Sequence, residues 1–177
     1  MDEKEPFDLR PYLDIEEEVI QAGIVELAEG AESSLSVEHS ASALIMAAAG
    51  ELVELAGQEQ YEQLPSAVGQ LCLWWVAFCH MTGQAWNTAV GTQQQYPENL
   101  RYEIKALHPL LLCKDIAKQS GAALQAIESQ NGVAFRQLLA ESMLSADALA
   151  RQDGLTLLEC VRQALDININ NGALHAW

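Results

Sequence analysis

The sequence PSAVGQLCLWWVAFCHMTG at residues 65–83 decides the fold class. Pro65 suits the first turn of a helix, and Gly83 is typical of the residue that ends one. The residues between them are apolar nearly all round, which predicts a helix enclosed by other elements on every side. Its most apolar part, residues 71–79, is too short to span a bilayer. We therefore expect this helix to be the most buried element of the protein.

The rest of the chain is also typical of helices. Half of the 177 residues are hydrophobic, good helix formers dominate, and the alternating pattern of strands is almost absent. We predict one all-α domain, residues 1–177, with an N-terminal arm to about Tyr12 and a joint at residues 32–36. A loop at residues 91–98 should separate two halves. The helices expected are Ile15 to near Gly30, Val37–Ala56, Pro65–Thr82, Trp86–Val90, Leu100 to Ser120 or beyond with a bend at Pro109 and an interruption at Gly121, Val133–Gln152 and Thr156–Asp166.

The charge limits the partners. The chain has 25 Asp and Glu against 9 Lys and Arg, a net charge of −16, which repels nucleic acids and anionic membranes. The N-terminus is acidic and lacks the apolar core of a signal peptide, so we expect a cytoplasmic protein. The cysteines form no Cys-x-x-Cys pair, and each lies in an apolar stretch. We expect buried free thiols at Cys72, Cys79, Cys113 and Cys160.

An internal repeat is indicated by features 71 residues apart. The interval separates two glycines that each follow an apolar helix, and other residues of similar type coincide at the same offset. The paired positions are Gly83 with Gly154, Val90 with Val161, Asn99 with Asn170 and Gln70 with Glu141. The pattern predicts two repeated helical hairpins, at residues 37–100 and 107–171, packed about a pseudo-two-fold axis into a helical bundle.

Two segments of the first half resemble a known family. AAAGELVEL at residues 47–55 resembles the first active-site helix of the all-α NTP pyrophosphohydrolases, the MazG-like group, and AVGQLCLWWV at residues 67–76 resembles the partner helix. Residues 81–83 and 86–90 resemble the glycine and short helix that follow. The resemblance implies a helical bundle in which four carboxylates bind Mg²⁺, and the metal activates water for attack between the α and β phosphates of a nucleoside triphosphate.

The chain departs from the family's pattern at most of the carboxylate positions. In the first half only Glu51 remains. In the second half Asp115 and Glu141 remain, but two lysines replace carboxylates and would repel Mg²⁺. Lys118 could take the place of a metal by pairing with Glu51. The family positions fall on Ala47, Ala48, Glu51, Ala67 and Gln70 in the first half, and on Lys114, Asp115, Lys118, Leu138 and Glu141 in the second.

Three functions remain open. We favour a duplicated, degenerate MazG-like member that binds a nucleotide or a protein without catalysis. The alternative is an active Mg²⁺-dependent pyrophosphohydrolase, and the third is an unrelated helical interaction or oligomerisation domain; a homodimer is compatible with all three. For an enzyme, Glu51 and Glu141 would be catalytic. The rebuilt metal site would consist of Glu51, Glu54, Asp115 and Glu141, and the substrate would contact Trp74, Trp75, Lys114 and Lys118.

The adjacent tryptophans point in different directions from one helix. We therefore expect one of Trp74 and Trp75 to lie in the core and the other to face a groove or a partner, where a nucleotide base could stack on it. Glu51 lies between Gly50 and Leu52 inside an apolar helix, and we expect it to be partly buried.

Overall fold

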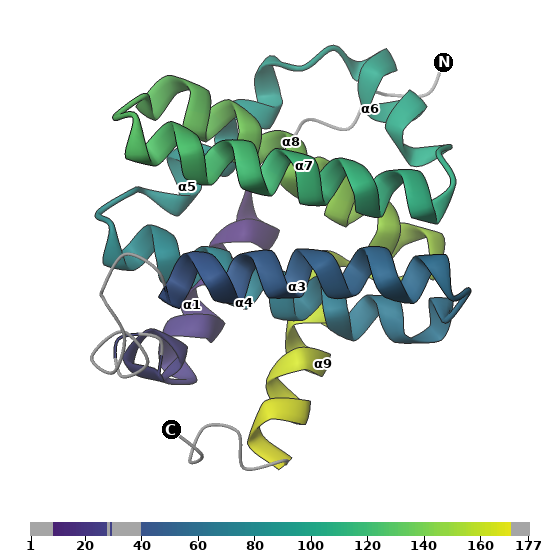
Figure 1. Cartoon of the computed structure of the whole chain (residues 1–177), viewed down its shortest axis with the longest axis horizontal. Coiled ribbons are helices and arrows are strands. Elements are labelled where there is room, and N and C mark those ends of the chain that lie inside the picture. Colours follow the sequence, from purple (N-terminus) through teal and green to yellow (C-terminus); the bar gives the residue numbers. More distant parts are fainter. Residues whose placement is uncertain (1–8, 28, 30–39, 171–177) are drawn as a thin grey trace.

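Two helical hairpins form the centre of the protein. The computed structural model describes residues 9–27, 29 and 40–170, and within these ranges it contains helices and no strand. The first hairpin consists of α3 (Ser40–Gly57) and α4 (Leu64–Met81), and the second of α7 (Pro109–Glu128) and α8 (Gly132–Gln152). Helix α3 packs against α7 and helix α4 against α8, so that the hairpins lie one on the other (Figure 1). The predicted all-α helical bundle is confirmed.

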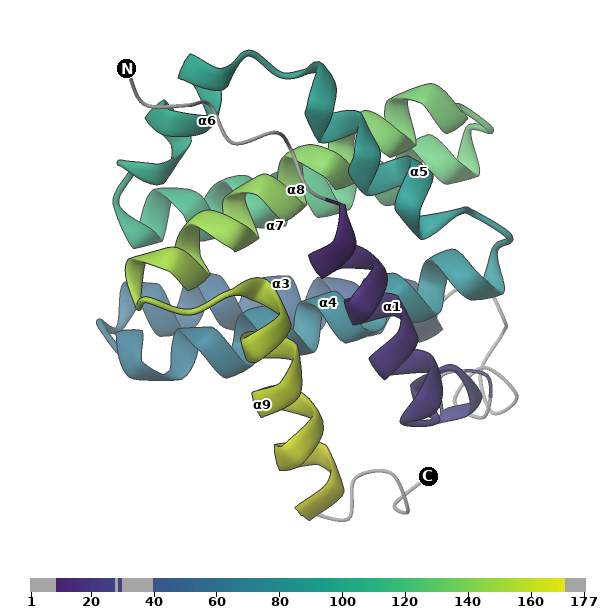
Figure 2. The ribbon, with the colours of Figure 1, turned by 180° about the vertical axis from the view of Figure 1, so that it is seen from behind.

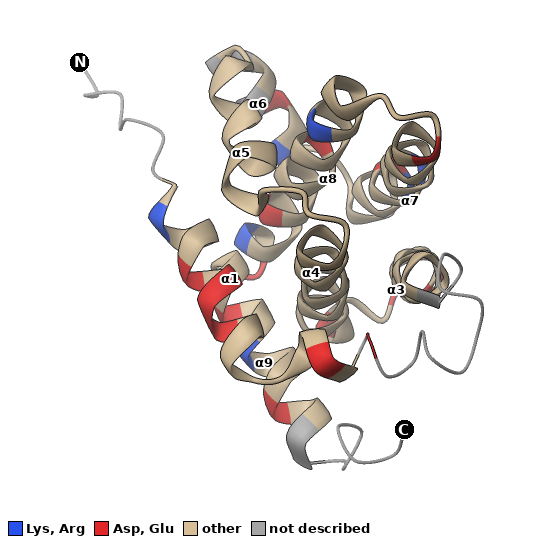
Figure 3. Cartoon of the chain, turned by 90° about the vertical axis from the view of Figure 1, so that its left-hand side faces the viewer, with Lys and Arg blue, Asp and Glu red and all other residues tan. Residues whose placement is uncertain are grey.

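The remaining helices cover one side of this bundle. Helix α9 (Leu157–Asn170) packs along α4, while α5 (Trp86–Gly91) and α6 (Glu98–Lys105) pack on α8. Helix α1 (Arg10–Gln21) contacts α4, α5 and α9 on that same side (Figures 2 and 3). Two short 3₁₀ turns, η1 (Tyr61–Gln63) and η2 (Thr92–Gln95), precede α4 and follow α5. As a result α4 has neighbours all round it.

Helix α4 is the most buried element, as predicted. Of its 18 residues, 14 are buried. Within the described part of the chain, Tyr61–Met81 is the one helical stretch long and apolar enough to cross a membrane, and 78% of its apolar window is buried inside the protein. Burial of this kind is what the core helix of a soluble protein shows.

The backbone repeats its geometry at an offset of 71 residues. Both hairpin turns contain a residue with a φ of 57°, Glu59 in the first and Gln130 in the second. Both second helices end before a glycine of positive φ, +70° at Gly83 and +71° at Gly154. The next helices, α5 and α9, begin 71 residues apart at Trp86 and Leu157. These coincidences support the predicted repeat, of which residues 37–39 and 171 lie outside the described residues.

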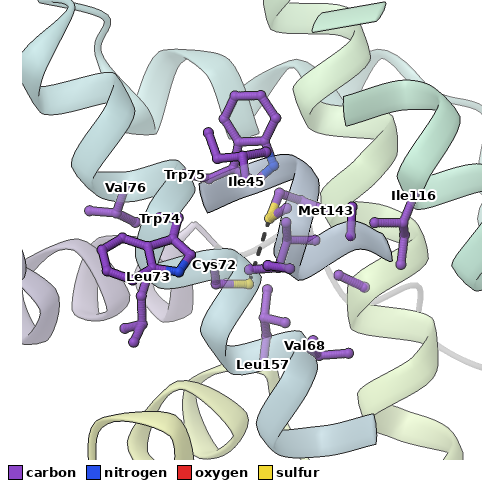
Figure 4. Close-up of a cluster of buried hydrophobic side chains, with 14 of the residues drawn as sticks. Ile45, Val68, Cys72, Leu73, Trp74, Trp75, Val76, Ile116, Met143 and Leu157 are labelled. Atoms are coloured by element: carbon purple, nitrogen blue, oxygen red, sulfur yellow. Dashed lines mark hydrogen bonds between the residues drawn. The ribbon is translucent and has the colours of Figure 1, made fainter. Parts of the chain in front are cut away.

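The centre of the core also follows this offset. Cys72 of α4 and Met143 of α8 are 71 residues apart, and their sulfur atoms lie 3.9 Å from each other among buried side chains (Figure 4). Equivalent residues touch one another only where a two-fold axis passes between them. The contact is therefore the one that the predicted pseudo-two-fold arrangement requires, with its axis crossing between α4 and α8.

Two prolines make the element boundaries differ from those predicted. Helix α1 begins at Arg10 rather than Ile15, because Pro11 occupies the first turn, where a proline breaks no intrahelical hydrogen bond. It ends at Gln21, before Gly23 with a φ of +76°, and residues 24–27 form a further helical turn. The arm at residues 1–8 and the joint at residues 32–36 lie outside the described residues.

The predicted bend at Pro109 is a complete break. Helix α6 ends at Lys105, and His108 has an extended backbone (φ −61°, ψ 141°), which is the conformation that a following proline favours. The His108 side chain accepts a hydrogen bond from the Leu110 backbone N–H and so caps α7. Gly121 does not interrupt α7, which continues to Glu128.

Candidate functional site

The carboxylates predicted to bind a metal do not gather. Glu51 and Glu54 are exposed on α3, and the Glu54 carboxylate accepts a hydrogen bond from Gln58 Nε2 at 3.3 Å. Asp115 and Glu141 are half-buried on α7 and α8. Among the residues that the structure describes, no group of three His, Cys, Asp or Glu side chains is placed to hold a metal ion. The four predicted ligands are therefore not brought together.

The expected partial burial of Glu51 is wrong. Helix α3 turns Leu52 and Leu55 into the core, and both are buried. Because successive residues differ by about 100° around a helix, a residue that directly precedes Leu52 lies off this buried stripe. Glu51 consequently points to solvent.

The alignment of the second half also needs correction. The two residues of positive φ in the hairpin turns fix the offset at 71 residues. At that offset Asp115 is one helical turn away from any family carboxylate position, and Lys114 is likewise displaced. The positions equivalent to Ala47, Ala48 and Glu51 are Lys118, Gln119 and Ala122, while Leu138 and Glu141 keep the places first assigned to them.

The predicted pairing of Lys118 with Glu51 is absent from the described structure. Lys114 and Lys118 are both exposed on α7. The ion pairs formed among the described residues join Arg151 to Asp147 and Arg162 to Glu18, which links α9 to α1. The lysines of α7 therefore face solvent and are not arranged around a carboxylate.

Both tryptophans of α4 are core residues. Trp75 is fully buried, with its ring edge-on to Phe78 at a centroid distance of 5.5 Å, and Trp74 retains 9% exposure. The prediction that one of them faces a groove is wrong, because α4 has helices on all sides. Figure 4 shows the two rings among the side chains of the buried cluster. Neither ring offers a free face for a ligand.

A cavity of about 270 Å³ lies at the junction of α6, α7 and α8. It combines apolar side chains with two polar groups from facing helices, Gln119 of α7 and Glu141 of α8. Both polar residues occupy family positions at the 71-residue offset. The full lining consists of Tyr96, Leu100, Ile104, Gln119, Glu141 and Leu144.

Tyr96 holds one edge of this cavity. Its hydroxyl lies 3.0 Å from Glu141 Oε1 and 3.2 Å from the Gln137 carbonyl oxygen. Burial and the neighbouring carboxylate together raise the pKa of the Tyr96 phenol above its ordinary value. The phenol therefore stays protonated and donates its hydrogen bond, and this bond fixes the position of the Glu141 carboxylate.

Gln119 presents an unsatisfied acceptor. Its Oε1 atom is buried and has no hydrogen-bond partner among the described residues. A buried acceptor without a donor costs free energy, so such an atom in a cavity is a point at which a ligand can bind. Gln119 would have been found from the sequence with the correct register, whereas Tyr96 follows three glutamines and carries no signal of its role.

The equivalent position in the first half is closed. There Gln70 Oε1 accepts a hydrogen bond of 2.8 Å from Asn168 Nδ2 of α9, and the same Nδ2 donates to the Ala164 carbonyl oxygen. Ala48, which corresponds to Gln119, is a buried core residue. The cavity between α6, α7 and α8 is thus a property of the second half.

Comparison with known proteins finds no match to this chain among family models, curated proteins or solved structures.

Proposed function

We propose that the protein is a cytoplasmic MazG-like module that has lost the family's metal site and acts by binding rather than by hydrolysing nucleoside triphosphates. The resemblance places five functional positions in each half. At the 71-residue offset only two of the ten are carboxylates, Glu51 in the first half and Glu141 in the second. This scarcity of carboxylates is the observation that carries the proposal.

The loss of ligands bears directly on hydrolysis. Mg²⁺ requires an octahedral set of oxygen ligands, and its orientation by carboxylates is what lowers the pKa of the attacking water. A single carboxylate in each half, one of them exposed, leaves most of that set to solvent. A free triphosphate would in addition be repelled by a protein of net charge −16. Any nucleotide is therefore expected to bind as its Mg²⁺ complex.

The test combines binding and turnover. Calorimetry with Mg²⁺ and a panel of nucleoside triphosphates measures affinity, and a pyrophosphate-release assay on the same samples measures hydrolysis. We expect no release above that of the buffer, and the same result for Glu51→Gln and Glu141→Gln. Turnover by the wild-type protein that disappears in Glu51→Gln would contradict the proposal and favour the active enzyme. The absence of both binding and turnover would favour a protein-interaction domain.

A further inference from the structure

We propose that the cavity lined by Tyr96, Gln119 and Glu141 binds a small organic cation, an alkylammonium group carried on a short apolar chain. This inference rests on the proposed function only in treating the chain as a binding module, and it names the class of ligand for this cavity.

The polar groups of the cavity select a cationic donor. The Glu141 carboxylate and the unpartnered Gln119 Oε1 are both hydrogen-bond acceptors, and no Lys or Arg stands among the described lining residues. Tyr96 donates to one carboxylate oxygen only, Oε1. An ammonium group has three donors and a positive charge, so it can satisfy the Gln119 oxygen and neutralise the carboxylate together. A phosphate or carboxylate ligand would be repelled.

The remaining wall of the cavity suits an alkyl chain. Leu100 and Ile104 of α6 face the cavity together with Leu144 of α8, which is itself buried. Apolar walls around a few polar groups are the usual composition of a small-molecule site. The volume of about 270 Å³ is slightly below the ~300 Å³ at which sites for drug-sized ligands begin, so the ligand is small and a whole nucleoside triphosphate does not fit.

The two halves differ in a way that sets the stoichiometry. Asn168 already occupies the hydrogen-bonding position of Gln70, so the first half offers no equivalent acceptor. The net charge of −16 raises the local concentration of cations around the whole molecule but does not create a second cavity. One alkylammonium ion should bind at this cavity per chain.

The experiment is a nuclear magnetic resonance titration of the full chain with n-butylammonium chloride. We expect saturable shifts of the Gln119 side-chain amide and the Leu144 methyl signals with a stoichiometry of one. Sodium butanoate, which has the same chain length and the opposite charge, should produce no saturable shift at these groups. Each titration is run at constant ionic strength, so that general salt effects cancel.

Two variants connect the binding to named atoms. Glu141→Gln keeps the shape of the side chain and removes the charge, and we expect at least tenfold weaker binding of n-butylammonium. The matched control is Glu128→Gln, which removes the same charge from an exposed residue at the end of α7 and should leave the affinity unchanged. Gln119→Leu removes the second acceptor at similar volume and should weaken binding about threefold, which is about 0.7 kcal/mol.

Four results would overturn the proposal. They are butanoate binding as tight as that of n-butylammonium, unchanged affinity in a folded Glu141→Gln variant, equal losses in the Glu128→Gln control, and no saturable shift at all. Nα-acetyl-lysinamide presents the same ammonium on a peptide backbone, so tighter binding of this analogue would assign the cavity to a protein lysine instead. Pyrophosphate release would refute the proposed function and leave this result standing, so the two failures are distinguishable.

Discussion

In the first half of the molecule α4 is covered along its length by the 14-residue helix α9, whereas in the second half α8 is covered by the 6-residue helix α5 together with α6. The hairpins beneath have the same turns and caps. The longer cover brings Asn168 onto Gln70 and closes that position, while the shorter cover leaves Glu141 and Gln119 at a cavity. One backbone plan thus gives a closed or an open polar position according to the segment that lies over it.

The largest effect is expected at the closest approach between α4 and its cover. A Cβ at Gly69 would lie 2.0 Å from the carbonyl oxygen of Cys160 and 2.5 Å from its carbonyl carbon. Both atoms belong to the backbone of α9 and cannot move aside as a side chain does. We expect Gly69→Ala to lower the free energy of unfolding by more than about 3 kcal/mol, measured by urea denaturation.

The equivalent residue of α8 provides the control for Gly69. Ala140 is 71 residues further on, is fully buried and already carries a Cβ. Ala140→Gly should cost only about 1 kcal/mol, the difference in helix propensity. A loss of less than about 1 kcal/mol in Gly69→Ala would contradict the close contact between α4 and α9.

The next effect concerns the contact at the proposed axis. Met143 is fully buried and its sulfur lies 3.9 Å from that of Cys72. We expect Met143→Ala to lower the free energy of unfolding by about 2.5 kcal/mol. In a double-mutant cycle with Cys72→Ala, the two losses should differ from additivity by about 0.5 kcal/mol or more. Additive losses would mean that the side chains do not interact.

A smaller effect appears at alkaline pH, where a thiol distinguishes α9 from α5. Cys160 corresponds to Ala89, and burial raises the pKa of the Cys160 thiol to about 12. Below the ordinary thiol pKa both the folded and the unfolded chain hold the proton, and the contribution to stability is fully present. Between the ordinary pKa and about 12 only the unfolded chain ionises, so stability is lost as pH rises.

The variant Cys160→Ala isolates this dependence, because it gives α9 the residue of α5. Stability of the wild type should fall more steeply than that of the variant, by up to about 1.4 kcal/mol per pH unit above pH 9. Denaturation curves of both proteins at pH 9 and pH 10 measure the difference. Parallel pH profiles would mean that the Cys160 thiol ionises freely in the folded protein.

The smallest effect compares the open and closed polar positions. Tyr96→Phe removes the hydrogen bond to Glu141, and Asn168→Ala removes the one to Gln70. Each variant should lose about 1 kcal/mol of stability by thermal or urea denaturation. Only Tyr96→Phe should alter the shifts that n-butylammonium produces at Gln119. Equal changes in both variants would contradict the assignment of the cavity to one half.

Much of the fold could be predicted from the sequence because it depends on local signals. The apolar run after Pro65 and the glycines at positions 83 and 154 define both second helices and the spacing of 71 residues. Helix boundaries at Pro11 and Pro109 were less accurate, since a proline can begin a helix as readily as it ends one.

The candidate site was harder to predict because it depends on register and on distant contacts. A shift of four residues keeps a helix face almost unchanged, so Lys114 and Asp115 matched the family pattern as well as Lys118 and Gln119 did. The burial of Trp74 depends on the helices that enclose α4, which no pattern within that helix reveals. Tyr96 reaches Glu141 across 45 residues of sequence.

The central claim, that two halves meet at a 71-residue offset, is tested most directly by nuclear Overhauser spectroscopy on methionine-methyl-labelled protein. The Met143 methyl group should show a cross-peak to the β protons of Cys72. The Met46 methyl should show one to the α protons of Gly121, since its carbon lies 3.8 Å from the position a Cβ would take there. Cross-peaks that instead place Met143 opposite a residue one helical turn from Cys72 would contradict the offset and the cavity built on it.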